Sequence, residues 1–338
     1  MFNSIQINLI LFFVTLILFF FYKRRIISVF LNLYDYPKIG RKRHQNPVSL
    51  VNGFLILVCL ILILLIDIFF LQLSPLKTNI IFIILFTVFF TIGYLDDLRN
   101  LKPTVKTFCI FLVLLIIIPL DQSLVLKQLV FKNFFEKTII LNESSLFLTV
   151  FFIYIFYNFM NFSDGLNGIA ISLSIFFIGV LIFERGIITY LELILLLSLL
   201  SCLIFNVLNL SFLGNSGISL LSVVISLIYI QDYNINKTLL CDQIFIIFLI
   251  PGLDLIRLVI ERIFKGQPFY QGDLNHLHHL MTKIFQKRVV FIFYMMISTL
   301  PYLISNIIKD FKISIFLGVI LYICFFLFLK NHPKKIKV

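Results

Sequence analysis

Residues 50–71 read LVNGFLILVCLILILLIDIFFL, a run of 22 residues with one charged side chain, Asp67. A helix of that length crosses the roughly 30 Å hydrocarbon core of a bilayer. Similar runs recur along the whole chain, which is 61% hydrophobic and 13% charged and contains 42 phenylalanines among its 338 residues. A soluble domain has about 45–50% apolar and about 25% charged residues. Together with a mean hydropathy of +1.08, this composition indicates an integral membrane protein.

The apolar runs are uninterrupted and do not alternate with polar residues, so they predict helices and not the strands of a barrel. Within a bilayer every backbone polar group must be bonded internally, as it is in a helix. We therefore predict an all-α, polytopic bundle of about eleven transmembrane helices that forms one membrane domain over residues 1–338. The predicted spans are 5–22, 50–71, 79–95, 105–120, 145–160, 168–184, 187–208, 217–230, 243–260, 289–308 and 313–329.

The basic residues predict the orientation of these spans. If the spans alternate in direction, 20 of the 28 Lys and Arg fall on the side that receives the C-terminus. The positive-inside rule places that side in the cytoplasm, with the N-terminus outside. The net charge of +12 is thus a topology signal and does not indicate nucleic acid. The first span has no small-residue cleavage site and is expected to be retained.

Two other features suggest no chemistry of their own. The five cysteines are scattered without a CxxC pair, so we expect small apolar core residues and neither disulfides nor a zinc site. The segment 121–144 is expected on the outer side, and we assign it no function.

Four polar clusters interrupt the apolar pattern, and the predicted topology places all four at the cytoplasmic ends of spans. They are residues 93–100, 158–168, 212–217 and the end of the loop after the ninth span, 273–279. Taken singly, each has a structural explanation: a solvated helix end, a tight turn, an N-cap at Asn215 or Ser216, or a headgroup-binding patch. Their common placement on one face favours a functional site.

The residue types in these clusters suit phosphoryl transfer. The adjacent carboxylates Asp96 and Asp97 suit a hard cation such as Mg2+, which takes one or two carboxylates plus phosphate oxygens. The glycine-bounded loops 165–168 and 214–217 open onto helix N-termini, where backbone N–H groups can face an anion. Nearby His, Lys and Arg can neutralise a diphosphate. A membrane scaffold around such a site suggests that one substrate is a lipid.

The motifs resemble those of the polyprenyl-phosphate N-acetylhexosamine-1-phosphate transferases, which are relatives of phospho-N-acetylmuramoyl-pentapeptide transferase. The similarity extends from about residue 35 to residue 279. It rests on Asp35-Tyr36-Pro37 with Arg41-Lys42-Arg43-His44, on Asp96-Asp97-Leu98-Arg99-Asn100 with Pro103 and Lys106, on Asn158-x-x-Asn161-x-x-Asp164-Gly165-x-x-Gly168, and on Pro251-x-x-Asp254 with Asp273-x-x-His276-x-His278-His279.

The resemblance implies an enzyme that transfers an N-acetylhexosamine 1-phosphate from a UDP-sugar to polyprenyl (undecaprenyl) phosphate, releasing UMP and starting a cell-surface glycan such as an O-antigen. It implies Mg2+, or Mn2+ in its place, as cofactor and a bacterial inner membrane as location. The expected partners are the UDP-N-acetylhexosamine, the polyprenyl phosphate and the membrane, without nucleic acid, and related enzymes suggest a homodimer. The identity of the sugar cannot be predicted from the sequence.

The resemblance also implies roles for single residues. The lipid phosphate is expected at Asp96 and Asp97, one of them acting as base, with Lys106 and Asn100 beside it. The nucleotide is expected near Asn158, Asn161 and Asn167, the metal at Asp97, Asp164 and Asn215, and the diphosphate at His276, His278 and His279. Arg41 and His44 are expected to attract the anionic donor. Asp254 and Arg257, three apart on a helix, are expected to pair and to be structural.

Several departures from the family pattern keep other interpretations open. Asn52 replaces a glycine, one residue is inserted before Arg41 and another before Asp273, and the segment before Phe212 is one residue short. Asn215 stands where relatives have an aspartate that resembles a metal ligand, which leaves a catalytically impaired, lipid-binding homologue as an alternative. A transporter is a further alternative, because Asp67 and Glu192 are ionisable residues within predicted spans.

Overall fold

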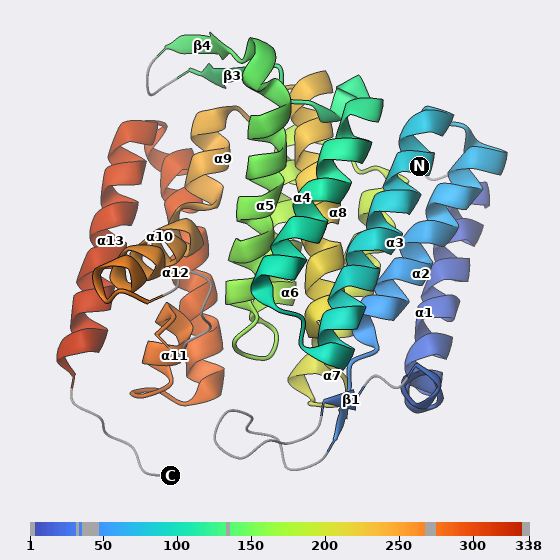
Figure 1. Ribbon diagram of the computed structural model, residues 1–338, viewed down its shortest axis with the longest axis horizontal. Coiled ribbons are helices and arrows are strands. Elements are labelled where there is room, and N and C mark those ends of the chain that lie inside the picture. Colours follow the sequence, from blue (N-terminus) through green and yellow to red (C-terminus); the bar gives the residue numbers. More distant parts are fainter. Residues whose placement is uncertain (1–3, 32–33, 36–46, 133–135, 268–274, 333–338) are drawn as a thin grey trace.

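The computed structural model describes residues 4–31, 34–35, 47–132, 136–267 and 275–332. Most of its helices run side by side in one bundle (Figure 1). They are α1 Ser4–Phe30, α2 Asn52–Ile66, α3 Leu76–Arg99, α4 Pro103–Ile117, α5 Ser145–Ser163, α6 Ile169–Arg185, α7 Tyr190–Val207, α8 Gly214–Ile235, α9 Cys241–Ile247, α10 Leu249–Phe264, α11 Leu277–Met281, α12 Lys287–Ile308 and α13 Phe311–Asn331. Short turns of π or 3-10 helix extend α2, α4 and α5. The predicted helical, polytopic architecture is confirmed.

Two small antiparallel strand pairs were not predicted. Strand β1 (Tyr34–Asp35) pairs with β2 (Val48–Ser49), and β3 (Gln128–Phe131) pairs with β4 (Lys137–Ile140). The second pair is a hairpin that occupies much of the segment 121–144 at the top of Figure 1. We call this end of the bundle the hairpin end, and the opposite end, which carries α11, the histidine end.

Eight helices in the described part of the chain are long and apolar enough to cross a membrane, or nine if α9 and α10 form one span. Helix α6 has 17 residues, and the apolar part of α1 is shorter. The count of eleven therefore stays a prediction.

The predicted span 243–260 is not one straight helix. Helices α9 and α10 meet at an angle of 73°, and Figure 1 shows α10 lying across the bundle. The break follows from Pro251, which has no N–H to donate to the carbonyl of Ile247 four residues earlier and whose ring would collide with it. Helix α9 accordingly ends at Ile247. The bend directs α10 along the histidine end.

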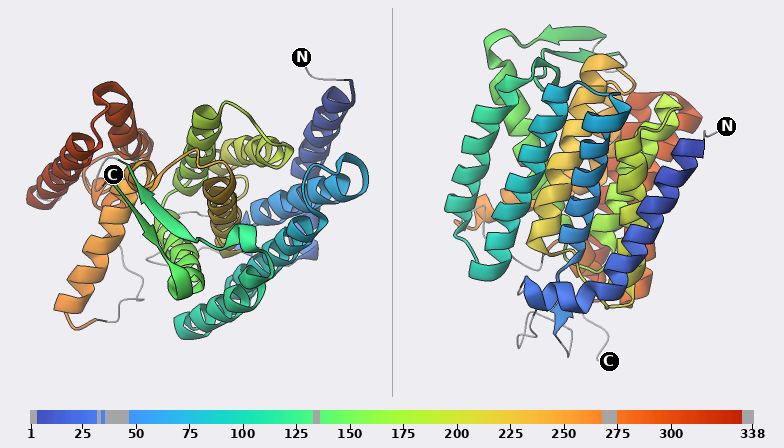
Figure 2. Two further views of the ribbon diagram at one scale, coloured as in Figure 1. Left: turned by 90° about the horizontal axis from the view of Figure 1, so that it is seen from above. Right: turned by 90° about the vertical axis from the view of Figure 1, so that its right-hand side faces the viewer.

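Helix α8 is the centre of the bundle, as the view from above shows (Figure 2). Of its most apolar window, 83% is buried inside the protein, against 17% for α4 and 22% for α13. Small side chains allow neighbouring helices to approach α8 closely. At Gly93 of α3, an added Cβ would lie 2.3 Å from the carbonyl oxygen of Asn215, so only glycine fits there.

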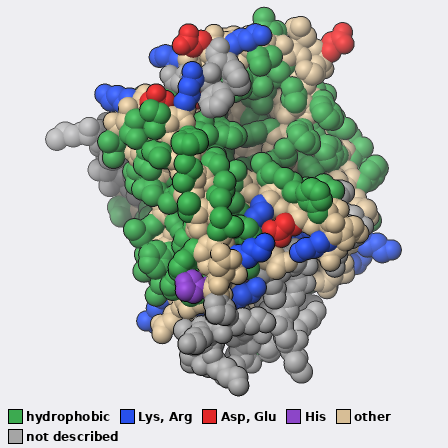
Figure 3. Space-filling model, turned by 90° about the vertical axis from the view of Figure 1, so that its left-hand side faces the viewer, with side chains coloured by type: hydrophobic (Ala, Val, Ile, Leu, Met, Phe, Trp, Pro, Cys, Tyr) green, Lys and Arg blue, Asp and Glu red, His purple; other side chains and the backbone are tan. Residues whose placement is uncertain are grey.

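The outer surface has the character expected of a lipid-facing protein. Figure 3 shows a broad apolar area on the face that carries α13, with one group of charged side chains at its top and another below its middle. Such large apolar areas are rare on soluble monomers. The cysteine prediction holds for the buried Cys59 and Cys202 but is wrong for Cys324, which is exposed. An apolar side chain such as cysteine can face lipid as well as the protein core, because lipid is itself apolar.

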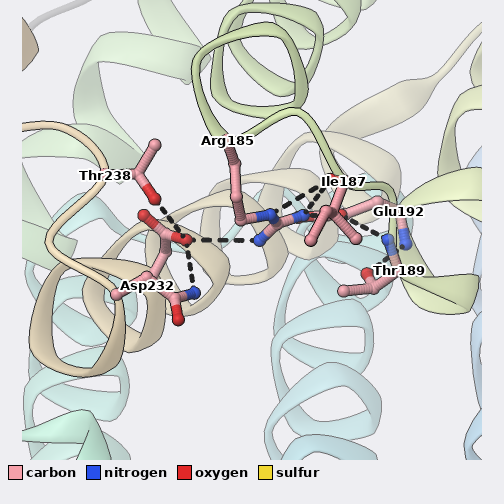
Figure 4. A network of polar contacts seen from close by, with 7 residues as sticks. Arg185, Ile187, Thr189, Glu192, Asp232 and Thr238 are labelled. Atoms are coloured by element: carbon pink, nitrogen blue, oxygen red, sulfur yellow. Dashed lines mark hydrogen bonds and ion pairs between the residues drawn. The ribbon is translucent and has the colours of Figure 1, made fainter.

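The two ionisable residues behind the transporter interpretation lie at helix ends. Asp67 accepts hydrogen bonds from the backbone of Leu73 and Ser74 after α2. Glu192 caps the start of α7 and pairs with Arg185, whose Nη1 also lies 3.2 Å from Asp232 Oδ1 (Figure 4). Both sites belong to the hairpin end, so neither provides a charge in the middle of a span.

Candidate active site at the histidine end

Asp97, in the last turn of α3, is bound to the start of α8. Its Oδ1 accepts a hydrogen bond from the backbone N–H of Asn215 at 2.9 Å, and its Oδ2 accepts one from Ser216 at 3.0 Å. A carboxylate is favoured there by the partial positive charge of a helix N-terminus. We expected these N–H groups to face a substrate anion. The structure corrects that expectation: the anion at the start of α8 is Asp97.

Asp96 faces the other way. Its Oδ1 accepts a hydrogen bond from the N–H of Leu101, and its Oδ2 lies 2.9 Å from Lys106 Nζ in the first turn of α4. Lys106 Nζ also lies 5.6 Å from the centre of the Tyr157 ring on α5. Tyr157 is buried, and its Oη has no hydrogen-bond partner in the described structure. Our sequence reasoning missed Tyr157, because one aromatic residue among many gives no signal.

The loop between α5 and α6 contributes the third group of residues. Asp164 follows the last residue of α5, and its N–H donates to the carbonyl of Asn161 at 3.4 Å. The side chain of Asn158 donates to the carbonyl of Tyr154 in its own helix. Asn167 is exposed and donates to Asn209 Oδ1 at 2.5 Å, which ties this loop to the one that follows α7.

Gly165 brings this loop against the histidines. A Cβ at Gly165 would lie 1.9 Å from Nε2 of His278 and 2.7 Å from Nε2 of His279, so any larger residue would displace both rings. The centres of these two rings are 4.3 Å apart. The contact joins two clusters that are more than a hundred residues apart in the sequence.

The three histidines differ in accessibility. His278 is 1% exposed, and neither ring nitrogen has a hydrogen-bond partner in the described structure. Burial, followed by the neighbouring His279 and His276, lowers the pKa of His278 well below its usual 6.5, so the ring is neutral. His276 is also buried, and its Nδ1 lies 3.6 Å from Asp254 Oδ2. Only His279 is partly exposed.

The predicted pair on α10 is confirmed. Arg257 Nη2 lies 2.8 Å from Asp254 Oδ1, and both side chains are largely buried. Asn100, the last predicted substrate-binding residue in this region, is exposed and ends α3 in a left-handed conformation with φ of 49°. Arg41, His44 and Asp273 lie outside the described residues.

Asp164 has a perturbed acidity. The protein around it, which removes water, and then the negative charge of Asp97 raise the pKa of Asp164 to about 8. The side chain of Asp164 is nevertheless exposed to solvent. An acid with this pKa is mostly protonated at neutral pH and loses its proton when a cation binds beside it.

The donor set fits Mg2+ better than a metal held entirely by protein. In the described part of the chain there is no group of three or more His, Cys, Asp and Glu that could hold a metal ion. Asp97, Asp164 and Asn215 offer two carboxylates and one amide. Mg2+ in phosphoryl-transfer sites is typically bound by one or two carboxylates, with substrate phosphates and water completing its six ligands. The residues present therefore fit that ion.

Asn52 explains one departure from the family pattern. Its Oδ1 accepts a hydrogen bond from Ser211 Oγ at 2.6 Å, and its Nδ2 donates to the carbonyl of Ser211 at 3.3 Å. Beside them the N–H of Phe212 donates to the carbonyl of Ser49 at 2.7 Å. These bonds fix the shortened segment that leads to Asn215. A glycine at position 52 could not make the side-chain bonds.

Comparison with known proteins adds an independent line of evidence. Residues 79–232 match the family described as glycosyl transferase family 4. The chain is also 31% identical over 200 residues to a probable undecaprenyl-phosphate N-acetylglucosaminyl 1-phosphate transferase of Bacillus subtilis (strain 168). That alignment covers 57% of this chain and 55% of the relative. The family match contains the first three polar clusters and ends before the histidines.

Proposed function

Because residues 79–232 match glycosyl transferase family 4, we propose that this chain is a sugar-phosphate transferase of that family. It transfers an N-acetylhexosamine 1-phosphate from a UDP-sugar to polyprenyl phosphate. The acceptor is undecaprenyl phosphate of a bacterial inner membrane, and the reaction takes place at the histidine end. The observation that carries the proposal is that the polar clusters meet in two pairs at the histidine end, and that Asp97 of one pair is close enough to Asp164 of the other to raise its pKa. Asp97 joins α3 to α8, and Gly165 joins the loop after α5 to His278 and His279. A collection of unrelated turns would not make these contacts.

The lipid phosphate is assigned to the region of Asp96 and Lys106. Lys106 pairs with Asp96, one of the two adjacent carboxylates, and this bond holds the ammonium group in place. A phosphate that arrives from the bilayer can pair with Lys106 as a point charge. The location suits a lipid, because α4 is the span with the smallest buried fraction and so lies open to the membrane.

The reaction is an in-line displacement at phosphorus. An oxygen of the lipid phosphate forms a bond to the β-phosphorus of the UDP-sugar, the bond from that phosphorus to the bridging oxygen breaks, and UMP leaves with the electron pair. Such transfers require positioning and charge neutralisation more than covalent catalysis. We assign the diphosphate to Asp164 and the partly exposed His279, because Gly165, the residue after Asp164, lies against the His279 ring.

Mg2+ is the proposed cofactor, and Asp97, Asp164 and Asn215 are the residues that would hold it. When bound, it supplies Lewis-acid neutralisation of charge on the diphosphate. Asp97 keeps a fixed orientation through its two bonds to α8, and each of its oxygens retains a further lone pair for a cation. The positive-inside rule supports a cytoplasmic position for this end of the bundle.

The test is transfer of radiolabel from a panel of UDP-N-acetylhexosamines to undecaprenyl phosphate in membranes that contain the full chain. Mg2+-dependent transfer with release of UMP, lost in Asp164→Asn, is the expected result. Asp164→Asn is preferable to a change at Asp97, because Asp164 anchors no helix. Glu143→Gln, at an exposed turn of the hairpin end, is the matched control. Absence of transfer with every donor would refute the proposal.

One observation favours a second candidate, a homologue that binds polyprenyl phosphate without efficient transfer. Asn215 contributes a neutral amide where a carboxylate would add a negative charge. Comparison of the native chain with Asn215→Asp separates the two candidates. If only the variant transfers label, the native chain is a binding homologue. If the native chain is active, the amide is sufficient.

A further inference from the structure

A dense network surrounds Arg257 on α10. Its Nε donates to Tyr322 Oη at 2.9 Å, its Nη1 to Glu261 Oε1 at 2.7 Å, and its Nη2 to Asp254 Oδ1 at 2.8 Å and to the carbonyl of Asn275 at 2.7 Å. A guanidinium group has five N–H donors, and four of them are used here. Arg257 is therefore poorly suited to bind a substrate phosphate and well suited to join parts of the protein.

Asp254 completes the network. Its Oδ2 accepts a hydrogen bond from the N–H of Leu277 at 3.1 Å, and its Oδ1 accepts one from Tyr322 Oη at 3.1 Å. The carbonyl of Asn275 and the N–H of Leu277 flank His276, so Arg257 and Asp254 hold the backbone on both sides of that residue. Asp254 and Tyr322 are each 5% exposed, so water cannot readily replace these bonds.

The network connects directly to the candidate site. The His276 ring lies parallel to the His278 ring, with centres 5.6 Å apart and planes 8° apart. His278 and His279 in turn lie against Gly165, next to Asp164. A shift of residues 275–277 would move the histidine rings relative to the loop that carries Asp164.

We propose that Arg257, Asp254 and Tyr322 form a clamp through which helix α13 positions the histidines for phosphoryl transfer. The inference rests on the proposed function, and it assigns a role to a helix outside the family match at residues 79–232. The three are positioning residues, because they act through the backbone of residues 275–277. Misplacement of a reacting group by about 1 Å can cost about a hundredfold in rate.

The chain contains a matched network for comparison. Arg185, at the hairpin end, pairs with two carboxylates, those of Glu192 and Asp232, and donates to the carbonyl of Ile187 (Figure 4). Arg257 similarly binds two carboxylates and a backbone carbonyl. Likewise Tyr302 donates from its Oη to Glu184 Oε1 at 2.6 Å. Both lie at the end opposite the histidines. Arg185→Lys and Tyr302→Phe are therefore controls for Arg257→Lys and Tyr322→Phe.

The experiment compares these four variants of the full chain, purified in detergent, by amide hydrogen exchange and by transfer kinetics. We expect Arg257→Lys and Tyr322→Phe to speed exchange at the Leu277 amide and to lower kcat by about tenfold or more. The KM for lipid phosphate should be unchanged, because Lys106 and Asp96 belong to other helices. The two control variants should lower the unfolding midpoint, but they should change neither the exchange rate at Leu277 nor kcat.

The clamp would be overturned by unchanged exchange at Leu277 in both variants, or by an equal loss of kcat in variants and controls. A rise in the KM for lipid phosphate that matches the loss of kcat would also contradict it. The exchange measurement needs no activity, so it tests the clamp even if the native chain transfers no label. If the native chain transfers no label but exchange is faster in the two variants, the proposed function is refuted and the clamp is not.

Discussion

Replacement of Asp97 should destabilise the protein apart from any effect on activity. Asp97 accepts backbone hydrogen bonds from Asn215 and Ser216 across 118 residues of sequence, at 2.9 and 3.0 Å. A hydrogen bond to a charged group contributes roughly 1.5–3 kcal/mol, and a buried donor left unpaired costs about 1–3 kcal/mol. Because Ser216 is fully buried, water cannot restore its bond in Asp97→Ala. We expect a loss of about 3 kcal/mol for Asp97→Ala.

Asp97→Asn should cost about half as much, because the amide keeps one acceptor oxygen but turns an NH2 group toward the second N–H. Asp310 is the matched control, because it accepts the N–H groups of Lys312 and Ile313 at 2.9 and 3.1 Å at the exposed start of α13. Asp310→Ala should cost about 1 kcal/mol, as is typical of a helix cap.

The assay is the unfolding midpoint of the purified full chain without Mg2+, followed by denaturant titration. The expected order of stability is native, Asp310→Ala, Asp97→Asn and Asp97→Ala. Equal midpoints for Asp97→Ala and Asp310→Ala would refute the reasoning, since Asp97 would then be an ordinary solvated carboxylate. Confirmation would mean that inactivity of Asp97 variants is not in itself evidence for a catalytic role.

Three further outcomes are expected. Gly93→Ala should prevent close packing of α3 on α8 and lower the unfolding midpoint strongly. Gly179→Ala in α6, where a Cβ meets nothing within 4 Å, should instead stabilise the protein by up to about 1 kcal/mol. Similar midpoints for the two variants would contradict the close contact of α3 with α8. Lys106→Met should raise the KM for lipid phosphate more than that for the UDP-sugar, and Lys102→Met, at an exposed site before α4, should change neither. The Mg2+ concentration for half-maximal transfer should increase as the pH falls below about 8, because protonated Asp164 must lose its proton to bind the ion. If that concentration does not change between neutral and alkaline pH, Asp164 is excluded as a ligand.

The membrane architecture could be predicted from the sequence because a lipid environment permits very few backbone structures. Apolar runs of span length have few alternatives to a helix in lipid, and the helices from α2 to α8 lie close to the predicted spans. The break between α9 and α10 was missed, although Pro251 was visible in the sequence. The hairpin β3–β4 was missed because its backbone bonds to Tyr233 and Asp242 involve residues about a hundred positions away.

The site could be predicted in part for a similar reason. Polar residues at span ends are conspicuous against an apolar background, so all four clusters could be recognised in the sequence as candidates. Their contacts could not be predicted. Nothing in the sequence shows that Asp97 faces α8 while Asp96 faces Lys106, since the two differ only by one position on a helix. Tyr157 and Tyr322 were missed because an aromatic residue within an apolar span has no distinguishing pattern.

The arrangement around α8 gives a physical reason why an asparagine can stand at position 215. The start of a helix carries about half a positive charge, and the single carboxylate of Asp97 already faces it. A second carboxylate at position 215 would lie next to the first, and Asp164, whose pKa is raised partly by Asp97, would add a third whenever it is ionised. Without a cation that concentration of charge is unfavourable. The amide of Asn215 removes one of the three charges and leaves an oxygen that can bind a cation, so the metal-free protein is expected to be more stable and its Mg2+ site weaker than with an aspartate.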